Sequence, residues 1–201
     1  DVAQCEAIMN EQGVQQGDRH ILLSTRDYNG MANNLATRGT MAGRPETAYG
    51  RALIGENIAG FSAYKLDYCP RLAVAVPGAG VTINGANQRY VPKATSTAGT
   101  GEVQNVDNRY QTLNVTVGAG GAIKAGDSFT IAGVNAVHQI TKADTGQPKT
   151  FRIISITSGG GTAGANVIVI SPPIIAADSA PTQAEQQYKN VTATPSSGAN
   201  L

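Results

Sequence analysis

The second half of the chain alternates apolar and polar residues in the way that is typical of β-strands. Residues 113–117 read Leu-Asn-Val-Thr-Val, which would place three apolar side chains on one face of a sheet. Similar patterns predict strands at 81–83, 106–117, 128–134, 150–157 and 167–171. No helical pattern of any length separates them, and consecutive strands without crossover helices pair in antiparallel fashion. We therefore expect an antiparallel β-barrel over residues 77–192.

The first 76 residues have a mixed character, with helical spacing in some places and short apolar runs in others. This pattern predicts helices at 2–12 and 31–37, a helical turn or two at 46–54, and a buried strand at 21–23. The character changes near Pro77. The expected fold class is therefore α+β, with a mixed segment at 1–76 and the β-barrel at 77–192.

The segment 126–154 carries the clearest strand signals. Phe129 begins an alternating strand that Gly133 interrupts, and a second strand is expected from Phe151. Between them, residues 142–149 hold Asp, Gly and Pro with hardly any apolar side chain, which predicts an exposed turn. Because aromatic residues are only 5% of the chain, we expect both phenylalanines to face one interior.

Composition and charge narrow the classes of function. The formal net charge is +1, which gives no broad electrostatic reason to bind nucleic acid, so we expect no sequence-specific nucleic acid binding. Cys5 and Cys69 lie far apart and are expected to be reduced, buried thiols. No apolar run approaches the roughly 20 residues that span a bilayer, and no leader sequence opens the chain, so no membrane partner is expected.

Candidates for catalysis, a cofactor or a metal site fail on their spacing. His20 and His138 have no HxxxH or Cys/His neighbours, so a zinc site is not expected. The glycine-rich stretch 158–164 lacks the lysine of a phosphate-binding loop and is expected to be a hairpin connection. Asp127 follows Gly126 and is expected to close a turn through its side chain. We expect no enzyme activity, no catalytic residue and no cofactor.

Several of these segments together resemble a known family. The sequence at 126–137, GDSFTIAGVNAV, is followed by T-x-x-x-x-G and FRI. Together these motifs resemble the inserted domain in the major coat proteins of short-tailed phages of the P22 kind. The NVDNRY segment at 105–110, ISP at 170–172 and IAGFSAYKLDYCP at 58–70 extend the resemblance over most of residues 19–192. The family's N-terminal arm, spine helix and extended loop have no counterpart here. The chain also begins without methionine, so it is expected to be a fragment.

The resemblance implies a fold, a function and a set of partners. It implies part of the axial domain of the Hong Kong 97-type capsid fold, followed by an inserted antiparallel β-barrel domain and by a truncated return segment at 193–201. The function would be that of a structural major capsid protein of a phage or prophage, which assembles with itself into an icosahedral shell. Scaffolding and portal proteins would be further partners. The protein would be made in the bacterial host cytoplasm and reside in the virion capsid.

The stretch 91–104 is the candidate for contact between subunits. Its composition alone favours an inert surface loop, because it has few bulky apolar residues and many turn formers. In the coat proteins that the chain resembles, a long loop at this place reaches a neighbouring capsomer. The charges available for such a contact are Arg89, Lys93, Glu102 and Arg109.

A second class of function stays open on the sequence. A β-sandwich module of a phage tail or surface protein, binding carbohydrate or serving adhesion, would also be rich in strands. Such a module is expected to expose aromatic side chains that stack on sugar rings. The chain has no tryptophan, seven tyrosines and three phenylalanines, which argues against this alternative.

Overall fold

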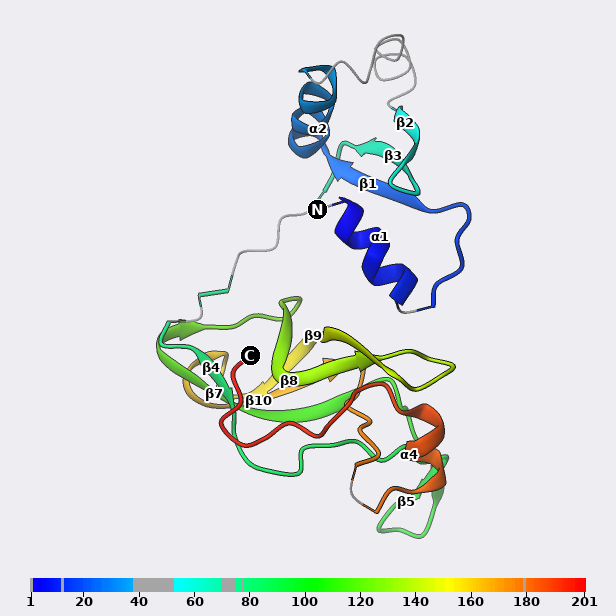
Figure 1. The fold of residues 1–201 in the computed structure, drawn as a ribbon. Helices are drawn as coiled ribbons and strands as arrows, with labels where there is room; N and C mark the ends of the chain where they lie inside the picture. The colour runs from blue at the N-terminus through cyan, green and yellow to red at the C-terminus, as the bar shows by residue number, and fades with distance from the viewer. Residues whose placement is uncertain (1, 12, 38–52, 70–74, 77, 179) are drawn as a thin grey trace. The chain divides into compact units, whose positions relative to one another are not determined.

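The chain forms two compact units, and each is described by itself. Unit 1 spans Asp1–Arg71 and unit 2 spans Leu72–Leu201. The structure is a computed structural model that describes residues 2–11, 13–37, 53–69, 75–76, 78–178 and 180–201 (Figure 1). Pro77, where the sequence changes character, lies outside these residues. Among the described residues, no helix has the length and apolar character needed to cross a membrane.

Unit 1 is a small sheet with a helix packed on it. Its elements are α1 (Val2–Glu11), β1 (His20–Ser24), α2 (Thr25–Thr37), β2 (Leu53–Ile58) and β3 (Phe61–Leu66). The strand order is β1-β3-β2, in which β1 pairs with β3 in parallel and β2 pairs with β3 in antiparallel fashion. The buried Tyr28 of α2 packs against Leu23 of β1 and Ile58 of β2, which joins the helix to the sheet.

Unit 2 is built around a five-stranded antiparallel sheet that curves strongly (Figure 1). The order of its strands is β4-β7-β10-β9-β8. Their bounds are β4 Val81–Ile83, β7 Gln111–Ala122, β8 Ser128–Val137, β9 Asp144–Ser158 and β10 Thr162–Ser171. A separate two-stranded hairpin consists of β5 (Thr95–Thr97) and β6 (Val103–Asn105), and a short helix, α4 (Gln183–Tyr188), follows the sheet.

One face of the curved sheet holds the core of unit 2. Along β7, buried and exposed residues alternate strictly through the first seven positions, as the sequence pattern predicts. The fully buried side chains include Leu113, Val115 and Ile168. Phe129 and Phe151 are paired across β8 and β9 with ring centroids 5.7 Å apart, so the expectation that they share one interior is confirmed.

The C-terminal residues, expected at 193–201 to form a truncated return segment, lie against both outer strands of this sheet. Leu201 donates its N–H to Val81 of β4 at 2.9 Å, and Ala132 of β8 donates to Asn200 at 2.9 Å. Ala199 and Leu201 also pack against the core cluster. The last residues therefore connect β4 with β8, the two strands at the edges of the five-stranded sheet.

Most of the predicted elements agree with the structure, and their lengths differ. The predicted helix at 2–12 is α1, the strand at 21–23 is β1, and the helix at 31–37 is the second half of α2. The glycine-rich stretch 158–164 forms the connection of the β9–β10 hairpin, as predicted. Asp127 closes its turn by accepting the N–H of Lys124 at 2.6 Å.

Several predicted element boundaries are wrong. The turn expected at 142–149 is shorter, because β9 begins at Asp144 and the turn is closed by a bond from the His138 N–H to the Ala143 carbonyl at 2.9 Å. The strand expected from residue 106 begins at Gln111. Most of the turn expected at 46–54 lies outside the described residues, and its last two residues, Leu53 and Ile54, belong to β2.

The expected burial of the two cysteines is also wrong. Cys5 and Cys69 are both unpaired thiols, as expected, but both are exposed. Cys5 lies on α1, where every described side chain is exposed or half-buried. Cys69 follows the end of β3 beside the exposed Tyr68. Neither residue therefore has neighbours that would remove it from solvent.

Candidate intersubunit surface

The β5–β6 hairpin stands out from the sheet of unit 2 as an exposed arm. All six residues of its two strands are exposed, including Val103, whose side chain is 68% exposed. The strands pair through three residue pairs, from Thr95 with Asn105 to Thr97 with Val103. The sequence placed an irregular loop here, and the structure shows a short ordered hairpin in its place.

The root of the hairpin is closed by the side chain of Asn108. Its amide nitrogen donates to the Lys93 carbonyl at 2.8 Å and to the Val106 carbonyl at 3.3 Å. Its amide oxygen accepts the Lys93 N–H at 3.0 Å and the Tyr90 hydroxyl at 2.9 Å. The amide of Asn108 thus bonds to both sides of the hairpin root, at Lys93 and Val106, and to the side chain of Tyr90, which precedes the hairpin.

Arg89 points toward charges of its own chain. Its guanidinium lies 3.4 Å from Asp178 and 3.4 Å from Glu185, whose side chain is only 1% exposed. Asp178 in turn accepts the N–H and the hydroxyl of Thr194 at 2.7 and 3.0 Å. Arg89 therefore holds α4 and the segments on both sides of it together.

The acids of this cluster are held in their charged form. Glu185 accepts the N–H and hydroxyl of Thr182 at 2.7 and 3.0 Å, and Thr182 accepts the Glu185 N–H, which completes a capping box at the start of α4. These bonds from Thr182, with Arg89 nearby, lower the pKa of Glu185 despite its burial. Burial alone would raise the pKa of Asp178, but the bonds from Thr194 and the charge of Arg89 lower it.

The other oxygen of the Glu185 carboxylate, Oε1, is buried and makes no hydrogen bond with a described residue. Its nearest described charge is the Nε of Arg89 at 3.4 Å. The carboxylate therefore depends on Arg89 for compensation of its charge, because an unpaired buried charge is costly.

Arg109 also has an acidic partner in its own chain. It forms a fork-like ion pair with Asp107, with its shortest contact at 2.7 Å, and its guanidinium lies 5.2 Å from the centre of the Tyr110 ring. The hydrogen bonds from Arg109 lower the pKa of Asp107 to about 2. Both side chains are exposed to water, so this pair contributes little to folding.

Lys93 and Glu102 differ from the two arginines. Both are exposed, Lys93 at the root of the hairpin and Glu102 just before β6. Neither side chain forms an ion pair within the described part of the chain. The structure therefore separates the four predicted residues into two with acidic partners nearby and two whose charges face solvent.

A shallow apolar hollow lies beside the hairpin root. It has a volume of about 590 Å³ and is lined by residues of the root, Pro92–Ala94 and Asn108, and by residues of the 173–190 segment, among them Ile175 and Tyr188. Tyr188 is 60% exposed. Figure 1 shows α4 and β5 at the same end of unit 2.

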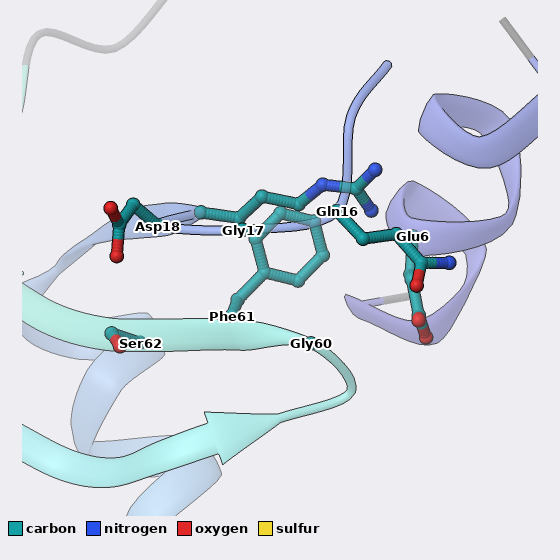
Figure 2. A pocket seen from close by; sticks show the side chains of 8 residues that line it. Glu6, Gln16, Gly17, Asp18, Gly60, Phe61 and Ser62 are labelled. Carbon is teal, nitrogen blue, oxygen red and sulfur yellow. The ribbon is translucent and has the colours of Figure 1, made fainter. Parts of the chain in front are cut away.

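Unit 1 contains a polar pocket of about 450 Å³ between α1 and the start of β3. Figure 2 shows Glu6 and Gln16 at one end of this pocket, Asp18 and Ser62 at the other, and Phe61 between them. Its buried cation, Arg19, bonds to the Asn10 side chain at 2.9 Å and to the carbonyls of Val14 and Gln15. Arg19 therefore fastens the end of α1. No group of metal-binding side chains occurs among the described residues.

Sequence reasoning missed the residues that organise this surface. Tyr90, Asn108 and Asp178 act through partners that lie 15 to 89 positions away, and such partners leave no local pattern. Glu185 did have a signal, because Thr182 followed three residues later by Glu is the sequence of a capping box.

Unit 2 is thus a strand-rich domain that carries an exposed hairpin. A comparison with protein families gives the P22 coat protein family, "P22 coat protein - gene protein 5", over residues 1–201. The chain belongs to this family, and it is a structural capsid protein of a phage. Among solved structures, it is similar to the CUS-3 coat protein I-domain, with 36% identity, 60% of this chain and 91% of that chain covered, and a TM-score of 0.43.

Proposed function

We propose that unit 2 is the inserted domain of a major coat protein and that its β5–β6 hairpin bridges neighbouring subunits of an icosahedral shell. The observation that carries the proposal is the hairpin itself, whose six strand residues are all exposed and which has two solvent-facing charges, Lys93 at its root and Glu102 before β6. A coat protein assembles with copies of itself, so the natural partner of such an arm is another copy.

Within this proposal the fold is that of the coat family. Unit 1 would be part of an axial domain of the Hong Kong 97-type fold. The sheet of unit 2 would close into a barrel through the C-terminal residues, which bond to both β4 and β8. Scaffolding and portal proteins would join the coat during assembly in the host cytoplasm, and the coat would act without enzymatic chemistry.

Lys93 and Glu102 would carry the polar part of the contact between subunits. Their charges are not compensated within the described chain, and charges that meet an opposite charge across an interface set its specificity and its rate of formation. Arg89 and Arg109 would act less directly, by holding α4 and the approach to β7 in place. Val103, exposed near the tip, would supply apolar contact.

The test is assembly of a coat protein without the arm. Replacing Thr95–Asn105 by a short glycine-serine turn keeps the root and changes loop-closure entropy by less than about 1 kcal/mol. We expect unchanged solubility and unfolding, with a strongly reduced yield of closed shells in sedimentation.

Charge reversals refine this test. Lys93→Glu should weaken assembly in a salt-dependent way, whereas Lys124→Glu, the same change on an exposed lysine between β7 and β8, should not. Normal shells from the protein without the hairpin would contradict the proposed function.

A further inference from the structure

Asn108 occupies a special position in unit 2, because it lies where the hairpin leaves the sheet domain. We propose that Asn108, supported by Tyr90, is a clamp that fixes the direction of the β5–β6 hairpin, and that this fixed direction is what allows a neighbouring subunit to be reached. The inference rests on the proposed bridging function of the hairpin. It assigns a positioning role to a residue that makes no contact with the partner.

At the hairpin root, the side-chain amide of Asn108 bonds to the backbone of Lys93 as a residue of a neighbouring strand would. It accepts the N–H of Lys93 and donates to the carbonyl of the same residue, at 3.0 and 2.8 Å. It also reaches the carbonyl of Val106 at 3.3 Å, on the returning side of the arm. Both sides of the root are thus fastened to one side chain.

Beyond the clamp, little connects the arm to the sheet. The next bond outward joins the N–H of Val106 to the carbonyl of Ala94 at 3.1 Å, and it lies within the arm itself. All residues of β5 and β6 are exposed, so no burial against the sheet restrains them. Without the amide, the root of the arm can open, and the three residue pairs of β5 and β6 can then open together with it.

Tyr90 connects the clamp to the core of unit 2. Its hydroxyl donates to the Asn108 amide oxygen at 2.9 Å. Its backbone N–H donates to the carbonyl of Ile174 at 2.7 Å, and Ile174 is a fully buried member of the core cluster. The two hydrogen bonds of Tyr90, one to Asn108 and one to Ile174, therefore link the root of the arm to the core of the domain.

The clamp is separable from the stability of the domain. Asn108 is half-buried and lies outside the core cluster, so its removal leaves the packing of the sheet intact. If Asn108 only stabilised the fold, its removal would lower the unfolding midpoint and speed up backbone hydrogen exchange throughout unit 2. A clamp would change the behaviour of the arm alone.

The experiment compares Asn108→Ala with Asn105→Ala in the coat protein. Asn105 is an exposed asparagine of the same arm whose side chain makes no hydrogen bond with a described residue. Backbone hydrogen exchange of the unassembled subunit is the first measurement, and the yield and diameter of shells is the second. For Asn108→Ala we expect roughly tenfold faster exchange, confined to residues 93–106, as for the loss of one or two net hydrogen bonds. We also expect few closed shells, with Asn105→Ala like the parent in both measurements.

Tyr90→Phe serves as a second variant if Asn108→Ala does not fold. It removes one hydrogen bond of the clamp and retains the ring, so exchange should rise less and in the same residues. Unchanged exchange at 93–106 would overturn the clamp, whatever happens to assembly. Raised exchange with normal shells would overturn its role in assembly. Normal assembly of the protein without the hairpin would contradict the proposed function and leave the exchange result for the clamp standing.

Discussion

Replacing Phe151 with alanine tests the packing of the sheet that supports the arm. Phe151 is 1% exposed and lies in the main core cluster of unit 2. Removal of a buried phenylalanine side chain costs about 3 to 5 kcal/mol, because transfer energy is lost and a cavity remains. Since whole domains are stable by about 5 to 15 kcal/mol, this is a large part of the stability of unit 2.

Phe129, the partner of Phe151, allows the energy of the contact between the two rings to be separated from the cost of losing each side chain. Phe129 lies directly opposite on β8, with 5.7 Å between ring centroids and 30° between the ring planes, and it is only partly buried. Phe129→Ala should therefore cost less than Phe151→Ala. The two changes together should cost less than their sum, by about 0.5 to 1.5 kcal/mol, the usual coupling of an aromatic pair.

Urea unfolding followed by far-ultraviolet circular dichroism measures these values. The slope of the free energy of unfolding against urea should stay unchanged, so that a shift in midpoint reports stability. Ile140→Ala is the control, because Ile140 is 86% exposed in the turn between the same two strands, and it should change stability by less than about 0.5 kcal/mol. A loss of less than about 1 kcal/mol for Phe151→Ala would refute this account of the core.

Three further predictions concern the glycine turn and the charge cluster. Gly161→Ala should destabilise more than Gly160→Ala in thermal unfolding, since both backbones have positive φ but only a Cβ at 161 would clash with the Ile123 carbonyl oxygen; equal effects would refute the close approach. Arg89→Ala should cost about 3 kcal/mol, because it leaves Glu185 buried without a cation, whereas Arg109→Ala should be close to neutral in the same urea assay. Because folding lowers the pKa of Glu185, its contribution is present above the ordinary value of 4.5 and is lost as pH falls below it. The urea midpoint should decrease as the pH is lowered through 4.5, and it should decrease less steeply in Glu185→Gln.

The strands of unit 2 were predictable because their side-chain pattern is set by burial. A strand with one face on the core must alternate, so residues 113–117 identified β7 from sequence alone. The beginning of β9 was not predictable, because it lacks a buried face and therefore an alternating pattern. Residues 144–150 include no fully buried side chain and pair with β8 through their backbones, so their Gly, Pro and polar residues have the composition of a turn.

The exposure of residues 91–104 was predictable from their composition, and the hydrogen bonds around them were not. The composition of residues 91–104 indicated exposure, and Lys93 and Glu102 are exposed there. Composition could not show that Arg89 has Asp178 as its partner, 89 positions away. The same holds for Asn108, since hydrogen bonds between distant segments depend on how the sheet brings those segments together.

A reconstruction of the assembled shell by electron cryomicroscopy tests the central claim most directly. At a resolution that traces the backbone, the density of Thr95–Asn105 can be followed from its root at Asn108. Our account predicts that this arm lies against a neighbouring subunit, with Lys93 and Glu102 facing opposite charges. An arm that ends in solvent at every position in the shell, with no density of another subunit beside it, would contradict the account.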